Sequence, residues 1–136
     1  EHLFVAAMPP PSMNETLFKG VCLDESWLSH MEIPDALKMD DGFMNEWLNL
    51  FKADSTLLNT YGYSEKPPID CPITAFGGTQ DPLVTQSELL QWRQHTAGKF
   101  NLQQLAGGHM FPVENKIKLL DIIGRNLIPS DYDQTQ

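Results

Sequence analysis

Two short segments carry residue types that could do acid–base chemistry, an aspartate and a histidine, each behind a pair of glycines. Phe76–Pro82 reads Phe-Gly-Gly-Thr-Gln-Asp-Pro, and Leu105–Pro112 reads Leu-Ala-Gly-Gly-His-Met-Phe-Pro. A neutral histidine can accept a proton from a nucleophile near pH 7, and a carboxylate can fix the tautomer of its ring. Gly107 and Gly108 can take positive φ, so the backbone can turn sharply before His109. The pattern indicates that Asp81 and His109 act as a pair.

Each of these residues also has a plainer interpretation when it is taken singly. His109 could lie in an ordinary turn, and Asp81 could be a turn or helix-start residue before Pro82. Their placement favours the paired interpretation, because each follows an apolar run and one helical segment separates them. In open α/β sheets the reacting groups lie outside the carboxyl ends of the strands. Adjacent parallel strands are only about 4.8 Å apart, so we expect the Asp81 carboxylate within hydrogen-bond reach of a His109 ring nitrogen.

The elements that must position this pair are strands alternating with helices. Apolar runs predict parallel strands at His2–Met8, Cys71–Phe76 and Phe100–Leu105. The capping box Thr85-x-x-Glu88 predicts a helix that continues through Leu89, Leu90, Trp92 and Arg93 and is stopped by Gly98. A last helix is expected at residues 113–128, with Leu119, Leu120, Ile123 and Leu127 facing inward. This alternation predicts an α/β fold with helical crossovers.

A helical insertion separates the first two predicted strands. Asp40 or Asp41 can cap a helix that runs to Lys52, and a second amphipathic piece follows with Leu57, Leu58 and Tyr61 on one side. We also expect a short helix around Glu25–Met31 and a loop at Tyr61–Asp70, which contains two prolines. Phe43, Trp47 and Phe51 form an apolar stripe that could be core packing or the underside of a lid. The lid is favoured by the place of the segment, which interrupts the strand–helix alternation.

Composition excludes several classes of protein. The chain has 136 residues, 41% of them apolar, which fits one compact domain. Its net charge of −9, with no run of lysine or arginine, argues against nucleic acid and membrane as partners. The two cysteines are far apart and the other histidines are isolated, so we expect no metal site and a cytoplasmic protein with free thiols. The chain begins without methionine and enters an apolar strand at once, which suggests part of a longer polypeptide.

Several motifs together resemble a known family over residues 2–127. They are Leu3-Phe4-Val5 before a proline turn, Phe51-Lys52-Ala53-Asp54 leading to Tyr61, Cys71-Pro72-Ile73 with Gly77-Gly78-x-x-Asp81, Trp92, and Gly107-Gly108-His109-Met110-Phe111. The chain resembles the C-terminal half of the thioesterases that serve nonribosomal peptide and polyketide synthases, especially the stand-alone editing (type II) kind.

The resemblance implies a partial α/β-hydrolase fold over residues 1–136, with a helical lid at about 13–66. It implies that Asp81 and His109 are the last two members of a Ser-Asp-His triad, and that Phe43, Trp47 and Phe51 line an acyl channel. The substrate would be an acyl or peptidyl thioester on the phosphopantetheine of a carrier protein, and the chain would need no cofactor of its own.

The chain departs from the family pattern at the nucleophile. The family places its serine in Gly-x-Ser-x-Gly before the first strand seen here, and no serine of this chain lies in such a motif. The nearest approach is Gly62-Tyr63-Ser64, which has no second glycine. We therefore expect the nucleophile on a preceding segment or another chain. The alternative is a non-catalytic, thioesterase-like module that binds a carrier or partner domain.

Overall fold

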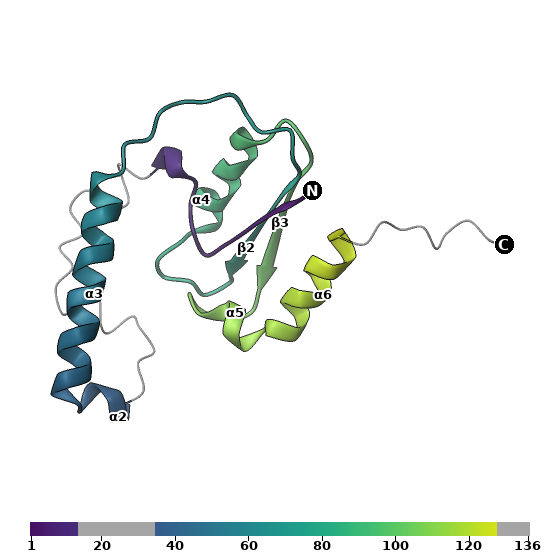
Figure 1. The fold of residues 1–136 in the computed structure, drawn as a ribbon. Helices are drawn as coiled ribbons and strands as arrows, with labels where there is room; N and C mark the ends of the chain where they lie inside the picture. The colour runs from purple at the N-terminus through teal and green to yellow at the C-terminus, as the bar shows by residue number, and fades with distance from the viewer. Residues whose placement is uncertain (14–34, 128–136) are drawn as a thin grey trace. The chain divides into compact units, whose positions relative to one another are not determined.

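The structure of this protein is a computed structural model that describes residues 1–13 and 35–127 (Figure 1). The chain divides into two compact units, one joining residues 1–10 to 66–136 and the other formed by residues 11–65. The second unit corresponds to the segment inserted between the first two strands.

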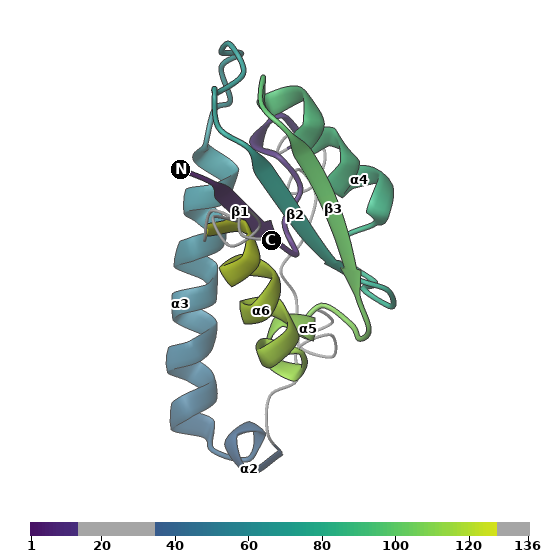
Figure 2. The ribbon, with the colours of Figure 1, turned by 90° about the vertical axis from the view of Figure 1, so that its right-hand side faces the viewer.

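The first unit is built on a three-stranded parallel sheet with strand order β1-β2-β3 (Figure 2). The strands are β1 (Leu3–Ala6), β2 (Ile73–Gly78) and β3 (Phe100–Leu105). All three predicted strands are confirmed, and β3 has the predicted bounds. The second strand does not end at Phe76 as predicted, because Gly77 and Gly78 continue the ladder by pairing with Gln104 and Leu105.

Side chains that alternate along the strands supply two cores, one on each face of the sheet. On one face, Ala75 packs with Val84 and Leu89, below α4 (Gln86–Leu90) and the 3-10 helix η3 (Gln91–His95). On the other face, Phe76, Leu105 and Phe111 pack with the last helix, α6 (Lys116–Leu127). The sheet thus lies between α4 and α6, as Figure 1 shows. The predicted α/β class, parallel strands with flanking helices, is confirmed.

The helix that follows β2 begins at the predicted capping box. The Thr85 side chain accepts from the Glu88 backbone N–H, and the Glu88 carboxylate accepts from the Thr85 backbone N–H at 2.7 Å. The α-helix ends at Leu90, however, and the chain tightens into η3, so Trp92 and Arg93 lie in a 3-10 helix. The Trp92 indole donates to the Met8 carbonyl at 2.8 Å, which ties this segment to the turn after β1.

The last predicted helix is interrupted. It starts earlier than expected, with α5 (Phe111–Glu114), and breaks at Asn115 before α6 begins. Leu119 and Ile123 face the core as predicted, together with Ile122. The inward assignment was wrong for Leu120 and Leu127, which are 64% and 55% exposed. Leu120 lies about 100° around the helix from Leu119 and so cannot share its contacts. Leu127 is the last residue of α6. The predicted end at residue 128 lies outside the described residues.

The second unit is helical where it is described. It contains η1 (Pro11–Met13), α2 (Asp35–Lys38) and α3 (Asp41–Thr60). Asp40 caps α3 by accepting from the Phe43 N–H at 3.0 Å, and the two predicted helical pieces form one continuous helix. The helix predicted around Glu25–Met31 lies outside the described residues. Within the described part of the chain, no helix combines the length and apolar character that crossing a membrane requires.

Candidate active site

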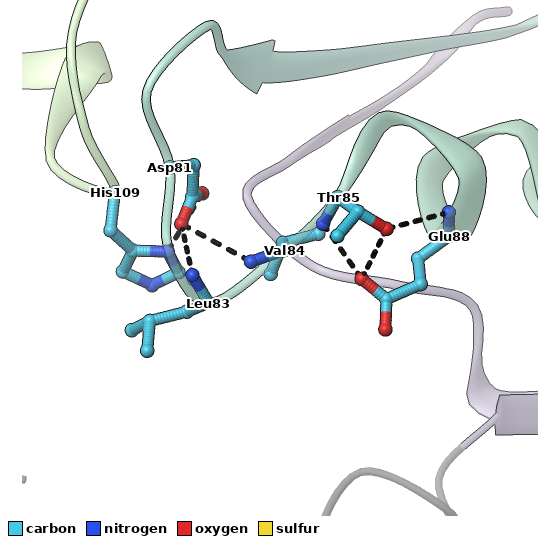
Figure 3. Close-up of polar contacts among 6 residues, drawn as sticks. All are labelled: Asp81, Leu83, Val84, Thr85, Glu88 and His109. Atoms are coloured by element: carbon cyan, nitrogen blue, oxygen red, sulfur yellow. Dashed lines mark hydrogen bonds and ion pairs between the residues drawn. The ribbon is translucent and has the colours of Figure 1, made fainter.

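Asp81 follows β2 at the carboxyl edge of the sheet, and its side chain is fully buried. One carboxylate oxygen, Oδ1, accepts from the backbone N–H groups of Leu83 at 2.8 Å and Val84 at 3.2 Å. These bonds close a turn of the kind that aspartate favours. The other oxygen, Oδ2, lies 3.0 Å from Nδ1 of His109 (Figure 3). Burying a carboxylate is costly unless it is hydrogen-bonded, and here both oxygens have partners.

His109 follows β3 at the same edge, and 32% of its side chain is exposed. A carboxylate has only acceptor atoms, so the ring must donate from Nδ1–H, which leaves Nε2 as the acceptor in the neutral ring. This is the tautomer that a general base requires. The expected contact between Asp81 and His109 is therefore confirmed, whereas the catalytic role of the pair stays a prediction.

Backbone hydrogen bonds hold the two loops together. The Thr79 N–H donates to the Leu105 carbonyl at 2.8 Å, and the Gln80 N–H donates to the Gly107 carbonyl at 2.9 Å. Such an approach requires glycine at position 78, because a Cβ there would overlap the carbonyl oxygens of Gly107 and Gly108. Gly78 therefore allows the loop that carries His109 to reach the loop that carries Asp81.

The two glycines before His109 have different roles. Gly107 has a φ of 115°, in the region that favours glycine, and a Cβ on it would also meet the Glu114 carboxylate. Gly108 does not have a positive φ, and a Cβ on it would meet only the Gln80 carbonyl oxygen, at 4.0 Å. The sharp turn expected from the glycine pair thus depends on Gly107.

Asn115 was missed by the sequence analysis and belongs to the same region. Its side-chain Nδ2 donates to the Ala106 carbonyl at 2.7 Å and to the Phe111 carbonyl at 3.0 Å. Asparagine forms helices poorly because its side chain competes for backbone hydrogen bonds. An asparagine between Glu114 and Lys116, inside a predicted helix, was the available signal.

Two further candidate features are a pocket in the first unit and an aromatic stripe in the second. A pocket of about 390 Å³ is lined by residues at the start of the strands, among them Thr74 and Asn101, and so lies at the amino-terminal edge of the sheet. Phe43, Trp47 and Phe51 belong to α3 in the second unit, where the Trp47 and Phe51 rings stack with centroids 5.2 Å apart. Their role in an acyl channel stays a prediction. The described residues include no group of three or more His, Cys, Asp or Glu side chains arranged to hold a metal ion.

Comparison with known proteins extends these observations. A family model described as "Thioesterase domain" matches residues 1–127. The gramicidin S biosynthesis protein GrsT of Aneurinibacillus migulanus is 33% identical over 131 residues, which cover 93% of this chain and 51% of that protein. The type II thioesterase BorB from the borrelidin biosynthetic cluster has a TM-score of 0.71 at 30% identity, covering 93% of this chain and 54% of that one.

A second solved structure is similar in fold and matches the same share of this chain. The RedJ thioesterase from the prodiginine pathway of Streptomyces coelicolor has a TM-score of 0.76 at 28% identity, covering 93% of this chain and 52% of that one. The chain thus spans about half the length of these relatives. Its sheet and flanking helices form part of an α/β-hydrolase fold, and because the family model matches nearly its whole length, the chain belongs to the thioesterase domain family.

Proposed function

We propose that the protein carrying this chain is a thioesterase that hydrolyses acyl or peptidyl thioesters on carrier proteins of nonribosomal peptide or polyketide synthesis. The observation that carries the proposal is the 3.0 Å contact between His109 Nδ1 and Asp81 Oδ2. It joins a fully buried carboxylate to a histidine that is partly open to solvent. This difference in exposure suits an orienting aspartate and a histidine that must reach a nucleophile and a substrate.

The proposed reaction uses a serine on a segment outside these 136 residues. His109 Nε2 removes the proton from the serine hydroxyl as its oxygen attacks the thioester carbonyl. The tetrahedral intermediate then collapses, the C–S bond breaks, and Nε2–H gives its proton to the departing thiolate. A water molecule, deprotonated by Nε2 in the same way, attacks the acyl-serine; the C–O bond to serine breaks, Nε2–H returns its proton to the serine oxygen, and the acid leaves. Asp81 keeps Nδ1 protonated and stabilises the imidazolium that forms in each half of the reaction.

The substrate class is inferred from the relatives. GrsT, BorB and RedJ are described as proteins of gramicidin S, borrelidin and prodiginine biosynthesis. By analogy, the proposed partner is an acyl or peptidyl carrier protein whose phosphopantetheine thiol holds the acyl group, and the chain itself needs no cofactor. We further propose that residues 13–66 form a lid in which Phe43, Trp47 and Phe51 line the acyl path.

Hydrolysis of an acyl-carrier thioester by the complete protein tests this proposal. His109→Ala should abolish turnover, and Asp81→Asn should lower it by about 10⁴-fold, as the same change does in a serine protease. His95, in η3 and away from the carboxyl edge of the sheet, supplies the control, and His95→Ala should retain turnover. If the protein binds the acyl carrier but His109→Ala hydrolyses it as fast as the wild type does, the chain is instead a binding module.

A further inference from the structure

The loop that carries His109 leaves β3 at Leu105 and enters α5 at Phe111, and its carbonyl groups are engaged by hydrogen bonds. The Leu105 and Gly107 carbonyls accept from the loop that carries Asp81, and the Gly108 carbonyl accepts from the Phe111 N–H at 3.2 Å. The remaining carbonyl between Leu105 and Gly108 belongs to Ala106. It accepts from the Asn115 side chain at 2.7 Å, the shortest of these bonds. With the Asn115 bond, every carbonyl from Leu105 to Gly108 accepts a hydrogen bond.

The position of Asn115 in the chain determines what the hydrogen bond to the Ala106 carbonyl connects. The residue lies between α5 and α6 with φ −111° and ψ 26°, and so interrupts the helix. Its backbone nevertheless bonds to both sides, since its N–H donates to the Phe111 carbonyl at 2.9 Å and its carbonyl accepts from the Leu119 N–H at 2.9 Å. Leu119 packs against the core that contains the fully buried Phe111. The Asn115 side chain thus connects the His109 loop to a part of the molecule that is fixed by packing.

The chemistry of the side chain is also specific. The amide nitrogen has two hydrogens, and Nδ2 donates to two carbonyls, those of Ala106 and Phe111. An aspartate of the same shape would place an acceptor against both carbonyls, and an alanine would reach neither. Among the hydrogen bonds of the described residues, no other side chain donates to the Ala106 carbonyl.

We propose that Asn115 is a positioning residue for His109, which holds the ring against Asp81 by fixing the Ala106 carbonyl. This inference rests on the proposed thioesterase function. Thr79 and Gln80 hold the loop from the Asp81 side, and Asn115 holds it from the helix side, so both anchors together fix the direction of the ring. Without the Asn115 side chain the loop keeps its bonds to Thr79, Gln80 and Phe111, but the Ala106 carbonyl is no longer held and the ring can turn from its productive direction. Misplacement of about 1 Å in an active site can cost roughly 100-fold in rate.

The test compares three variants of the complete protein. Asn115→Ala removes the donor, and Asn115→Asp removes it while keeping the shape of the side chain. Asn126→Ala is the matched control, because Asn126 also lies in the last helical segment and its Nδ2 also donates to a backbone carbonyl, that of Ile122 at 2.7 Å. For each we would measure kcat and KM for an acyl-carrier thioester, the melting temperature, and the NMR resonance of the His109 Nδ1 proton.

We expect both Asn115 variants to lose about 10- to 100-fold in kcat with KM nearly unchanged, and to shift the Nδ1 proton resonance. Asn126→Ala should change neither. A purely structural role predicts a lower melting temperature with unchanged kcat for the folded enzyme, and that result, or failure of both Asn115 variants to fold, would overturn the inference. If the wild-type protein hydrolyses no thioester, the proposed function fails, but the Nδ1 resonance still decides whether Asn115 positions the ring.

Discussion

At the scale of single residues, Asp81 has a structural role beside its proposed catalytic one. Its carboxylate accepts hydrogen bonds from two backbone N–H groups and from the histidine ring. The turn from Asp81 to Val84 therefore keeps its hydrogen bonds when the histidine is removed. Removing the aspartate, by contrast, leaves two backbone donors without their partner, and one of them belongs to the buried Val84.

This asymmetry predicts that Asp81→Ala destabilises the protein more than His109→Ala does. A buried donor that loses its partner costs about 1–3 kcal/mol, so we expect Asp81→Ala to lower the free energy of unfolding by that amount. We expect His109→Ala to lower it by less, because its side chain is partly exposed and Asp81 retains two donors. Urea unfolding of the two variants measures the difference. Equal losses would show that the histidine contact, rather than the turn, fixes Asp81.

A second prediction concerns the glycine that allows the two loops to approach. Gly78→Ala should lower both stability and turnover, because its Cβ would overlap the Gly107 and Gly108 carbonyls and push the His109 loop away from Asp81. Gly124→Ala is the matched control in α6, where a Cβ would meet nothing within 4 Å. Alanine favours a helix over glycine by about 1 kcal/mol, so the control should raise the melting temperature. If Gly78→Ala keeps wild-type turnover, the close approach of the loops is not needed.

These residues also show how far the site could be predicted from sequence. Asp81 and His109 were predictable because their chemistry needs those residue types, and because parallel strands bring residues past their carboxyl ends together. The role of Gly78 depends on a contact with a distant loop, and the role of Asn115 depends on where the Ala106 carbonyl lies. Neither contact has a sequence pattern, because both depend on distances that exist only once the sheet has formed.

At the scale of elements, local signals were reliable where one interaction decides the structure. The capping box at Thr85 starts α4 as predicted, and the three strands were predicted from their apolar runs. The last helix was predicted less well, because an apolar stripe cannot show that Asn115 interrupts it or that Leu120 and Leu127 are exposed. Hydrophobic periodicity gives the existence of a helix more reliably than its phase.

The lid proposed for α3 gives a prediction at this scale. Trp47→Ala should change the preference among acyl-chain lengths more than it changes stability, if the stacked Trp47 and Phe51 rings line the acyl path. The measurement compares turnover of carrier thioesters with short and long acyl chains, alongside thermal melting. Tyr61→Ala is the control, because Tyr61 is an exposed aromatic residue just beyond the end of α3. A loss of roughly 3–5 kcal/mol, typical of truncating a core aromatic, with unchanged chain preference would show that the stripe is core.

At the scale of the whole molecule, the first unit leaves apolar surface uncovered. Among the described residues, β1 pairs with β2 on one side, and its other edge has no strand beside it. Exposed strand edges invite pairing with other chains. Exposed apolar side chains also lie on the helices. They are Val113 in α5 and, at spacings that place them along one side of α6, Ile117, Leu120 and Leu127. Contiguous exposed apolar surface of this kind is typical of interaction sites or of surfaces prone to aggregation.

The last prediction follows from this surface. The 136-residue chain, produced by itself, should self-associate or have a low melting temperature, because within the described part of the first unit the β1 edge and one side of α6 are uncovered. Size-exclusion chromatography with light scattering gives the mass, and thermal melting gives the cooperativity. Charged substitutions on the helix, Ile117→Glu with Leu120→Lys, should reduce the association if that face is the cause, and leave it unchanged if the strand edge is. A monomer that melts cooperatively would show that the unit is stable with its edge open, and that the proposed segment with the nucleophile is not needed for folding.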